Sequence, residues 1–151
     1  SSAGQQAAAE TGAIEAALNA MQAHLQDMQV QMTGLYALKS LCCGYEAAML
    51  RAAEAGALRG AVAAMRAHPQ VEMVQRAAIW VLVDFGKGEA NKHRAAEAME
   101  RAVVFAAMKA FPKIKRIGQH LLDVLPTRRE RGQSLLKAFI ITPCLNSFAL
   151  T

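Results

Sequence analysis

The sequence predicts an all-α protein, and its composition, its hydrophobic period and an internal repeat all support this fold class. Alanine, leucine and methionine dominate the 151 residues, 54% of the residues are hydrophobic, and aromatic residues make up 5%. This composition favours helices over strands, which are enriched in β-branched and aromatic residues. It also supplies enough apolar material for the core of one domain. We therefore expect almost no β-sheet.

A sequence unit recurs along the chain. "MQAHLQDMQVQ" at 21–31 returns 44 residues later as "MRAHPQVEMVQ" at 65–75. A further copy, "VVFAAMKAFPKIK" at 103–115, follows 43 residues after "GAVAAMRAHPQVE". A fixed period of this length is typical of stacked helical repeats. We predict a repeat domain over residues 1–126, with units at about 1–43, 44–87 and 88–126.

Within the middle unit, apolar residues spaced three or four apart predict a short helix followed by a longer one. The expected core positions are Leu58, Val62 and Met65 on the short helix, and Val74, Ala78, Leu82 and Phe85 on the longer one. Pro69 should end the first helix and begin the second, and the glycines after Phe85 should end the second. We expect the longer helices of the three units near 27–41, 70–86 and 114–125.

The middle unit resembles a known repeat family. "EAGALRGAVAAMRAHPQVEMVQRAAIWVLVDF" at 54–85 is similar to the armadillo repeat, in which a short helix, a second helix opening with "AGAL" and a longer third helix stack into a right-handed α-solenoid. The resemblance extends from Gly12 to about Leu125. HEAT-type repeats share the length and the helical pairs, and they remain the alternative. The resemblance implies a right-handed α-solenoid of about three armadillo-like repeats with a C-terminal extension.

The resemblance also implies a binding face. In armadillo proteins that bind extended peptides, the third helices line a concave groove, where a tryptophan and an asparagine one turn later hold the ligand backbone. The corresponding pairs here are Tyr36 and Ser40, Trp80 and Asp84, and Asp123 and Thr127. Because the asparagine is absent from all three, recognition of basic nuclear-import signals is not implied. Tyr36 and Trp80 keep two interpretations, packing between neighbouring helices or contact with a partner.

Basic residues concentrate near the C-terminus, where residues 101–151 carry a net charge of +7 against −3 for residues 1–50. The candidate partner-binding residues in this region are Lys113, Lys115, Arg116, Arg128, Arg129 and Arg131. Such a cluster suits phosphate, anionic lipid or an acidic protein surface, and a solvated face is the plainer alternative. Because no aromatic residues are interleaved with these basic residues, the interpretation as a binder of single-stranded nucleic acid is less favoured. Contact with the charged phosphate backbone of RNA remains an alternative.

Residues 127–151 match no part of the earlier units. We expect a short basic helix at about 127–138 and then an irregular apolar tail, with Phe139, Ile140 and Phe148 as candidate partner contacts. Pro143 argues against a longer helix. An apolar tail of this kind usually marks an interaction surface.

Catalysis and metal binding have little support in the sequence. His24 and His68 are expected at helix ends, where an imidazole can bond the last free carbonyls, and no acid or nucleophile is spaced to act with them. "GKGEANK" lacks the spacing of a phosphate-binding loop. Three cysteines without a CxxC pair suit neither a disulfide framework nor a zinc site, which favours a reducing compartment. We expect no catalytic residue, metal or cofactor.

These features predict a non-catalytic protein-interaction scaffold that serves as an accessory or peripheral subunit of a larger assembly. Because the sequence begins with Ser1, removal of a targeting peptide is one explanation, and an organellar membrane complex of a chloroplast or mitochondrion is then one concrete setting. No run of 18 apolar residues suggests a transmembrane span, and peripheral membrane contact stays open. The alternative is an RNA- or ribosome-associated protein that binds phosphates through its basic C-terminal region.

Overall fold

The computed structural model describes residues 3–4, 12–127, 129–130 and 132–133. Within these residues the chain forms eight complete α-helices and one 3-10 turn, and it contains no β-strand. The predicted all-α class is therefore confirmed.

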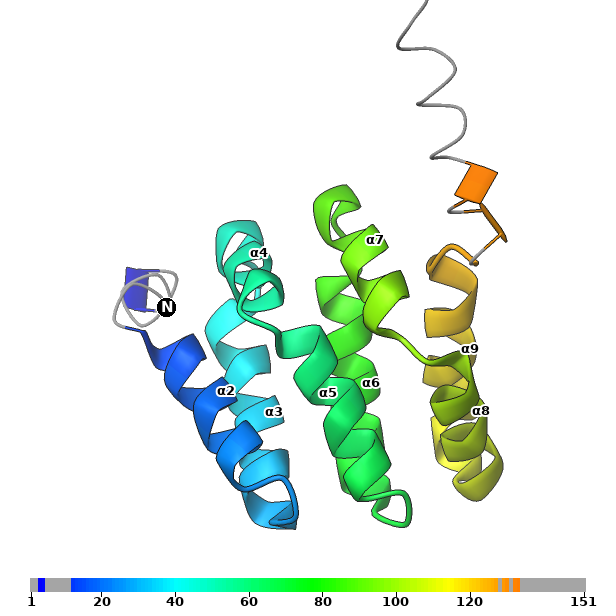
Figure 1. Cartoon of the computed structure of the whole chain (residues 1–151), viewed down its shortest axis with the longest axis horizontal. Coiled ribbons are helices and arrows are strands. Elements are labelled where there is room, and N and C mark those ends of the chain that lie inside the picture. Colours follow the sequence, from blue (N-terminus) through cyan, green and yellow to red (C-terminus); the bar gives the residue numbers. More distant parts are fainter. Residues whose placement is uncertain (1–2, 5–11, 128, 131, 134–151) are drawn as a thin grey trace, which may run out of the picture.

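Six of the helices form three pairs that stand side by side in chain order (Figure 1). The pairs are α2 (Ala13–Ala23) with α3 (Met28–Cys42), α5 (Ala57–Ala67) with α6 (Glu72–Phe85), and α8 (Arg101–Ala110) with α9 (Lys115–Val124). Two shorter helices, α4 (Glu46–Glu54) and α7 (Glu89–Ala98), connect one pair to the next, and the 3-10 turn η1 (Pro112–Ile114) precedes α9. Helix α3 packs against α6, and α6 packs against α9, so these three helices form one layer behind α2, α5 and α8.

Helix boundaries recur with the spacing found in the sequence. Helices α2 and α5 begin and end 44 residues apart, and α6 and α9 begin 43 residues apart. Gly12 and Gly56 precede α2 and α5 with φ angles of 80° and 104°, a left-handed conformation that side chains disfavour. His24 and His68 follow the same two helices with nearly equal backbone angles. The repeated sequence therefore folds into repeated local structure.

The predicted core positions of the central pair are buried. All seven, Leu58, Val62, Met65, Val74, Ala78, Leu82 and Phe85, are 5% exposed or less. They belong to one continuous hydrophobic core that also takes residues from the first and third pairs. The 3.6-residue period therefore identified the inward faces of α5 and α6 correctly.

In each of the first two pairs, a buried glutamine on the second helix bonds the end of the first helix. The side-chain amide of Gln31 donates hydrogen bonds to the carbonyls of Met21 and His24, at 2.7 and 2.9 Å. Gln75 donates in the same way to Met65 and His68, both at 2.8 Å. Each amide bonds one carbonyl in the last turn of the preceding helix and also the carbonyl of the histidine after it, which in addition accepts a backbone N–H from Asp27 or Val71. We refer to Gln31 and Gln75 as the amide clamps.

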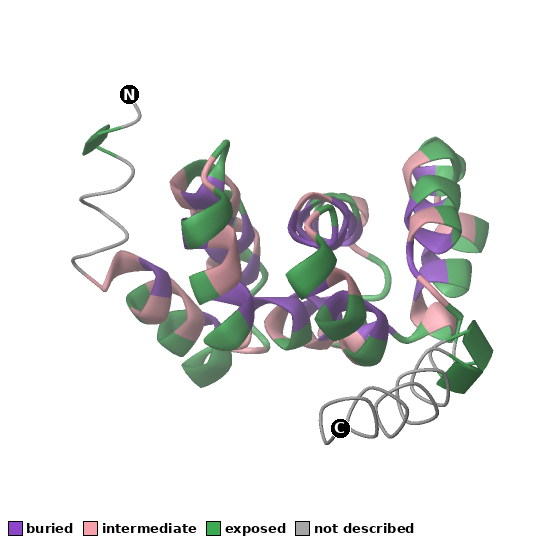
Figure 2. Cartoon of the chain, turned by 90° about the horizontal axis from the view of Figure 1, so that it is seen from above, coloured by how far each residue is buried: buried purple, intermediate pink, exposed green. Residues whose placement is uncertain are grey.

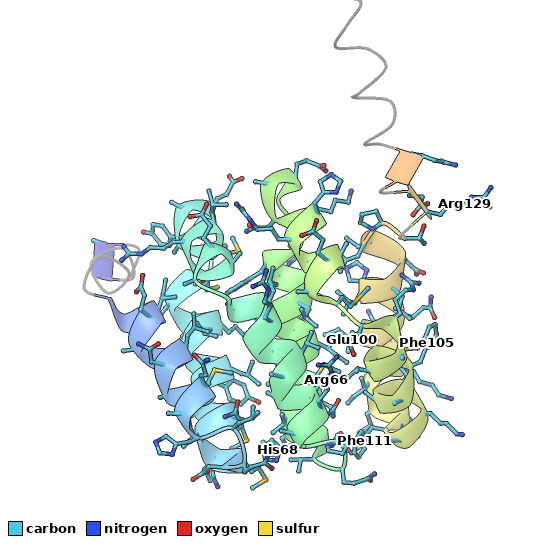
Figure 3. The ribbon with its side chains drawn as sticks, in the orientation of Figure 1. Arg66, His68, Glu100, Phe105, Phe111 and Arg129 are labelled. Carbon is cyan, nitrogen blue, oxygen red and sulfur yellow. The ribbon has the colours of Figure 1, made fainter. Side chains whose placement is uncertain are left out.

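The clamps correct the expectation for the histidines. The amide clamps, and not the imidazoles, bond the carbonyls at the ends of α2 and α5. The His68 ring instead lies 2.9 Å through Nε2 from the carbonyl oxygen of Leu25, which belongs to the preceding pair. His24 is exposed. His68 therefore connects two neighbouring pairs, a role that its position at a helix end did not predict (Figure 3).

The third pair lacks the clamp. Gly118 stands 43 residues after Gln75, in the corresponding place on α9. A Cβ atom there would lie 2.6 Å from Cγ of Met108, so the methionine side chain occupies this space. The Met108 side chain therefore packs against α9 at the position where the first two pairs carry the clamp glutamine.

Helix α6 ends before glycine as expected, but for a different reason. Gly86 has a φ angle of −80°, so it does not supply a left-handed turn. A Cβ atom at Gly86 would instead lie 2.8 Å from the carbonyl oxygen of Leu82 and 3.1 Å from Cδ2 of Leu125. Close packing between the end of α6 and the residue after α9 therefore requires glycine here.

Exposed ion pairs link successive parts of the array. Arg51 pairs with Glu15 at 2.9 Å, Arg94 pairs with Glu54 at 3.4 Å, and Arg66 of α5 pairs with Glu100 before α8 (Figure 3). Exposed pairs of this kind contribute only about 0–1 kcal/mol each. The hydrophobic core, and not these pairs, holds the array together.

A capping box follows α9. The backbone N–H of Thr127 donates to the Glu130 carboxylate at 2.6 Å, and the backbone N–H of Glu130 donates to the Thr127 hydroxyl at 3.3 Å. This reciprocal arrangement is typical of a helix start, which agrees with the predicted beginning of the basic helix at Thr127. The first bond in particular holds the pKa of Glu130 below its usual value. Residues 129–130 and 132–133 are helical, and the remainder of the range 127–151 lies outside the described residues.

Candidate functional site

Large apolar side chains are exposed on one layer of helices. Of the described residues, five large hydrophobic side chains are exposed, and four of them lie on α3 and α6: Met28, Tyr36, Met73 and Trp80, with Phe105 on α8 as the fifth. Figure 2 shows how burial alternates with exposure around each helix. Met73 and Trp80 are seven residues apart, so they lie on the same side of α6. We define the α3–α6–α9 face as the solvent-exposed side of these three helices, which faces away from α2, α5 and α8.

Trp80 lies at the surface of this face. Its side chain is 40% exposed, and Nζ of Lys39 on α3 lies 5.0 Å from the centre of its ring. A cation at this distance interacts favourably with the ring face and helps to hold its orientation. Tyr36, the equivalent residue on α3, is 41% exposed. Both aromatic residues therefore keep substantial area available for a partner, which favours partner contact over packing between helices alone.

The residues one turn after the aromatic side chains differ in their surroundings. Asp84 is half-buried and its carboxylate accepts a hydrogen bond from Nζ of Lys87 at 2.6 Å. Ser40 is exposed on α3. Asp84 is therefore already paired with a cation from the loop that follows α6, so it is a poorer candidate for direct partner contact than Trp80.

A groove runs between α6 and α9 with a volume of ≈ 870 Å³. Its lining consists of Arg76, Trp80, Val83, Lys87, Lys113, Arg116, Ile117, Gln119, His120 and Asp123. We call it the α6–α9 groove. It brings Trp80 together with Lys113 and Arg116, which the sequence assigned to two separate candidate sites.

Sequence reasoning missed part of this groove. Arg76 lies four residues before Trp80, on the same side of α6, and Lys87 lies in the loop after α6 and also lines the groove. Counting charge by blocks of 50 residues hides them, because acids elsewhere in the same block balance them. Counting charge by helix face could have found Arg76, whereas Lys87 lies in a loop that only the fold places at the groove. Val83 and Ile117 were missed because only the fold places the end of α6 beside α9.

Two other predicted basic residues are absent from the lining of the groove. Lys115 and Arg129 are exposed, and Arg129 lies beyond the end of α9 (Figure 3). Five predicted contacts lie outside the residues whose side chains the structure describes: Arg128, Arg131, Phe139, Ile140 and Phe148.

Reactive side chains do not gather at one place in the described part of the chain. No three histidine, cysteine, aspartate or glutamate residues there are arranged to hold a metal ion. Burial raises the pKa of the Cys42 thiol to about 11, so this thiol is protonated at neutral pH and a poor nucleophile. Nor does any helix in that part have the length and apolarity needed to cross a membrane. The features that distinguish the groove are its volume, its basic lining and the exposed Trp80 side chain.

Comparison with known proteins found no match to this chain among family models, curated proteins or solved structures.

Replacing Trp80 by alanine should lower the free energy of unfolding by about 1–2 kcal/mol, because a side chain that is already 40% exposed loses less than the ~3–5 kcal/mol of a buried aromatic residue. The interaction with Lys39 accounts for about 0.5–1 kcal/mol of this. Urea unfolding followed by circular dichroism measures the loss, with Lys39→Met as a control that removes only the cation. A loss above about 3 kcal/mol would place Trp80 in the core.

Proposed function

We propose that this chain is a non-catalytic protein-interaction scaffold, an accessory or peripheral subunit that docks onto a larger assembly through its α3–α6–α9 face. The one observation that carries the proposal is the set of exposed aromatic and apolar side chains on α3 and α6, next to a basic groove. Exposed apolar residues that gather on one face usually mark an interaction site. Aromatic residues and arginine are also the types most enriched in protein interfaces.

We further propose that the helix pairs are about three armadillo-like repeats in a right-handed α-solenoid. The recurring helix boundaries, the paired glycines before α2 and α5, and the two amide clamps support this interpretation. Stacked repeats of this kind present one continuous face made of equivalent helices. Tyr36 and Trp80 occupy equivalent places on that face, so they would contact successive parts of one partner.

The test is association of the chain with its natural assembly. A tagged Tyr36→Ala, Trp80→Ala double variant, expressed in place of the native chain, should lose most co-purification of the partner subunits that the wild-type chain retains. The matched control is Phe105→Ala, which removes an aromatic side chain that is 52% exposed on α8, away from the α3–α6–α9 face. Circular dichroism establishes that all three proteins are folded.

Three results would contradict the proposal. Retention of the partners by the double variant would exclude the α3–α6–α9 face, and equal loss in the Phe105→Ala control would show that the effect is not specific to this face. Loss of the wild-type association after nuclease treatment would favour the alternative of an RNA- or ribosome-associated protein, whose contacts go to phosphates.

A further inference from the structure

We propose that the α6–α9 groove binds an acidic peptide segment of the partner, with one apolar side chain of that segment against Trp80. This inference rests on the proposed function, because it assigns a ligand chemistry to part of the α3–α6–α9 face. It rests on three properties of the groove: its uncompensated positive charge, its apolar wall and its hydrogen-bond acceptor.

Positive charge in the groove exceeds negative charge. Arg76, Lys87, Lys113 and Arg116 face one acid, Asp123. Lys87 is paired with Asp84 at 2.6 Å. No carboxylate of a described residue lies within salt-bridge distance of Arg76, Lys113 or Arg116. Three cations, on α6, on the 3-10 turn η1 and on α9, therefore have no ion-pair partner in the described structure, and carboxylates from a bound segment would complement them.

The groove also has an apolar wall. Trp80 on α6 and Ile117 on α9 are partly exposed, and Val83 lies beside them with 5% of its surface exposed. Lys39 lies over the Trp80 ring and restrains it. A restrained aromatic side chain is a favourable anchor because it loses little conformational entropy on binding. This wall suits one apolar side chain between flanking acidic residues.

Asp123 favours a peptide over a nucleic acid as the occupant. Its carboxylate accepts a hydrogen bond from Nε2 of Gln119 at 2.7 Å, which places a negative charge on the α9 side of the groove. A peptide backbone can donate N–H groups to such an acceptor, whereas phosphates are repelled by it. Trp80 and the imidazole of His120 are the two ring side chains among the described lining residues, so a run of three or more bases would lack further stacking partners.

A random 12-residue peptide library displayed on phage tests this inference with the full-length chain. Selection against the wild-type chain should enrich peptides that carry several Asp or Glu residues around one apolar residue. Trp80 is the single tryptophan of the chain, so its emission reports binding of a selected tryptophan-free peptide. The variant Arg76→Glu, Arg116→Glu should bind that peptide at least 10-fold more weakly.

The matched control is Arg59→Glu, Lys109→Glu, which makes the same change in net charge at exposed residues of α5 and α8. It should retain the wild-type affinity. Enrichment of neutral or basic peptides, equal weakening in the control, or tighter binding of a 12-nucleotide single-stranded RNA than of the selected peptide would overturn the inference. If the groove variant also keeps its native assembly while the Tyr36→Ala, Trp80→Ala variant loses it, the proposed function stands and the acidic ligand is wrong.

Discussion

Replacing Phe85 by alanine should lower the free energy of unfolding by about 3–5 kcal/mol, the usual cost of truncating a buried aromatic residue. Phe85 is 2% exposed and occupies the last position of α6. The neighbouring Gly86 already lies close to side chains of Leu125 and Ala95, so the structure around the end of α6 is tightly packed. A cavity at Phe85 would remove contacts that the surrounding helices cannot restore by small shifts.

Urea unfolding followed by circular dichroism measures this effect, and Phe105→Ala is its control. The control makes the same chemical change at a side chain that is 52% exposed, and it should cost less than about 1 kcal/mol. A loss for Phe85→Ala as small as that expected of the control would show that Phe85 is not a core residue and that the arrangement of α6 is wrong.

Replacing Gln75 by leucine should cost roughly 2–4 kcal/mol, although leucine is of similar size and more apolar. The substitution removes the amide that donates to the carbonyls of Met65 and His68 at 2.8 Å. The Met65 carbonyl then loses its partner, at about 1–3 kcal/mol for a buried group left unsatisfied. The His68 carbonyl keeps the bond from the Val71 N–H at 3.2 Å and loses a second bond, at about 0.5–1.5 kcal/mol. Gln31→Leu should act in the same direction, because Gln31 makes the equivalent bonds in the first pair.

The same unfolding measurement tests the clamps, with Gln22→Leu as the control at an exposed position of α2. The control should change the free energy of unfolding by less than about 0.5 kcal/mol. If Gln75→Leu changed the free energy of unfolding as little as Gln22→Leu, the amide clamp would contribute nothing measurable to stability. The clamp would then not explain why Gln31 and Gln75 recur in the repeat.

Local features of the fold could be predicted from the sequence because they depend on nearby residues. The 44-residue spacing and the apolar period placed the helices and the core of the central pair, from Leu58 to Phe85. The repeated Gln31 and Gln75 were visible as identities, but their role was not. From the sequence alone, a glutamine between apolar residues is assigned to the polar face of its helix. Only the structure shows that its side chain lies beside the end of the preceding helix and bonds the carbonyls there.

The groove could be predicted only in part, for a similar reason. Trp80 follows from its place in the repeat, and Arg116 from the basic cluster, but nothing local to either residue brings them together. Their meeting depends on the packing of α6 against α9, which is a long-range property of the chain. The close packing at Gly86 depends on Leu125 in the same way. The hydrophobic period therefore cannot predict which residues that are distant in the sequence come into contact in the fold.

Photo-crosslinking in the natural assembly tests most directly whether the α3–α6–α9 face is the docking surface. Benzoylphenylalanine in place of Gln119, in the α6–α9 groove, should crosslink to a partner protein, because Gln119 is exposed there. The same probe in place of Ala47, an exposed residue of α4, should give no protein crosslink. Crosslinks from position 47 with none from position 119 would contradict the account and place the docking surface elsewhere.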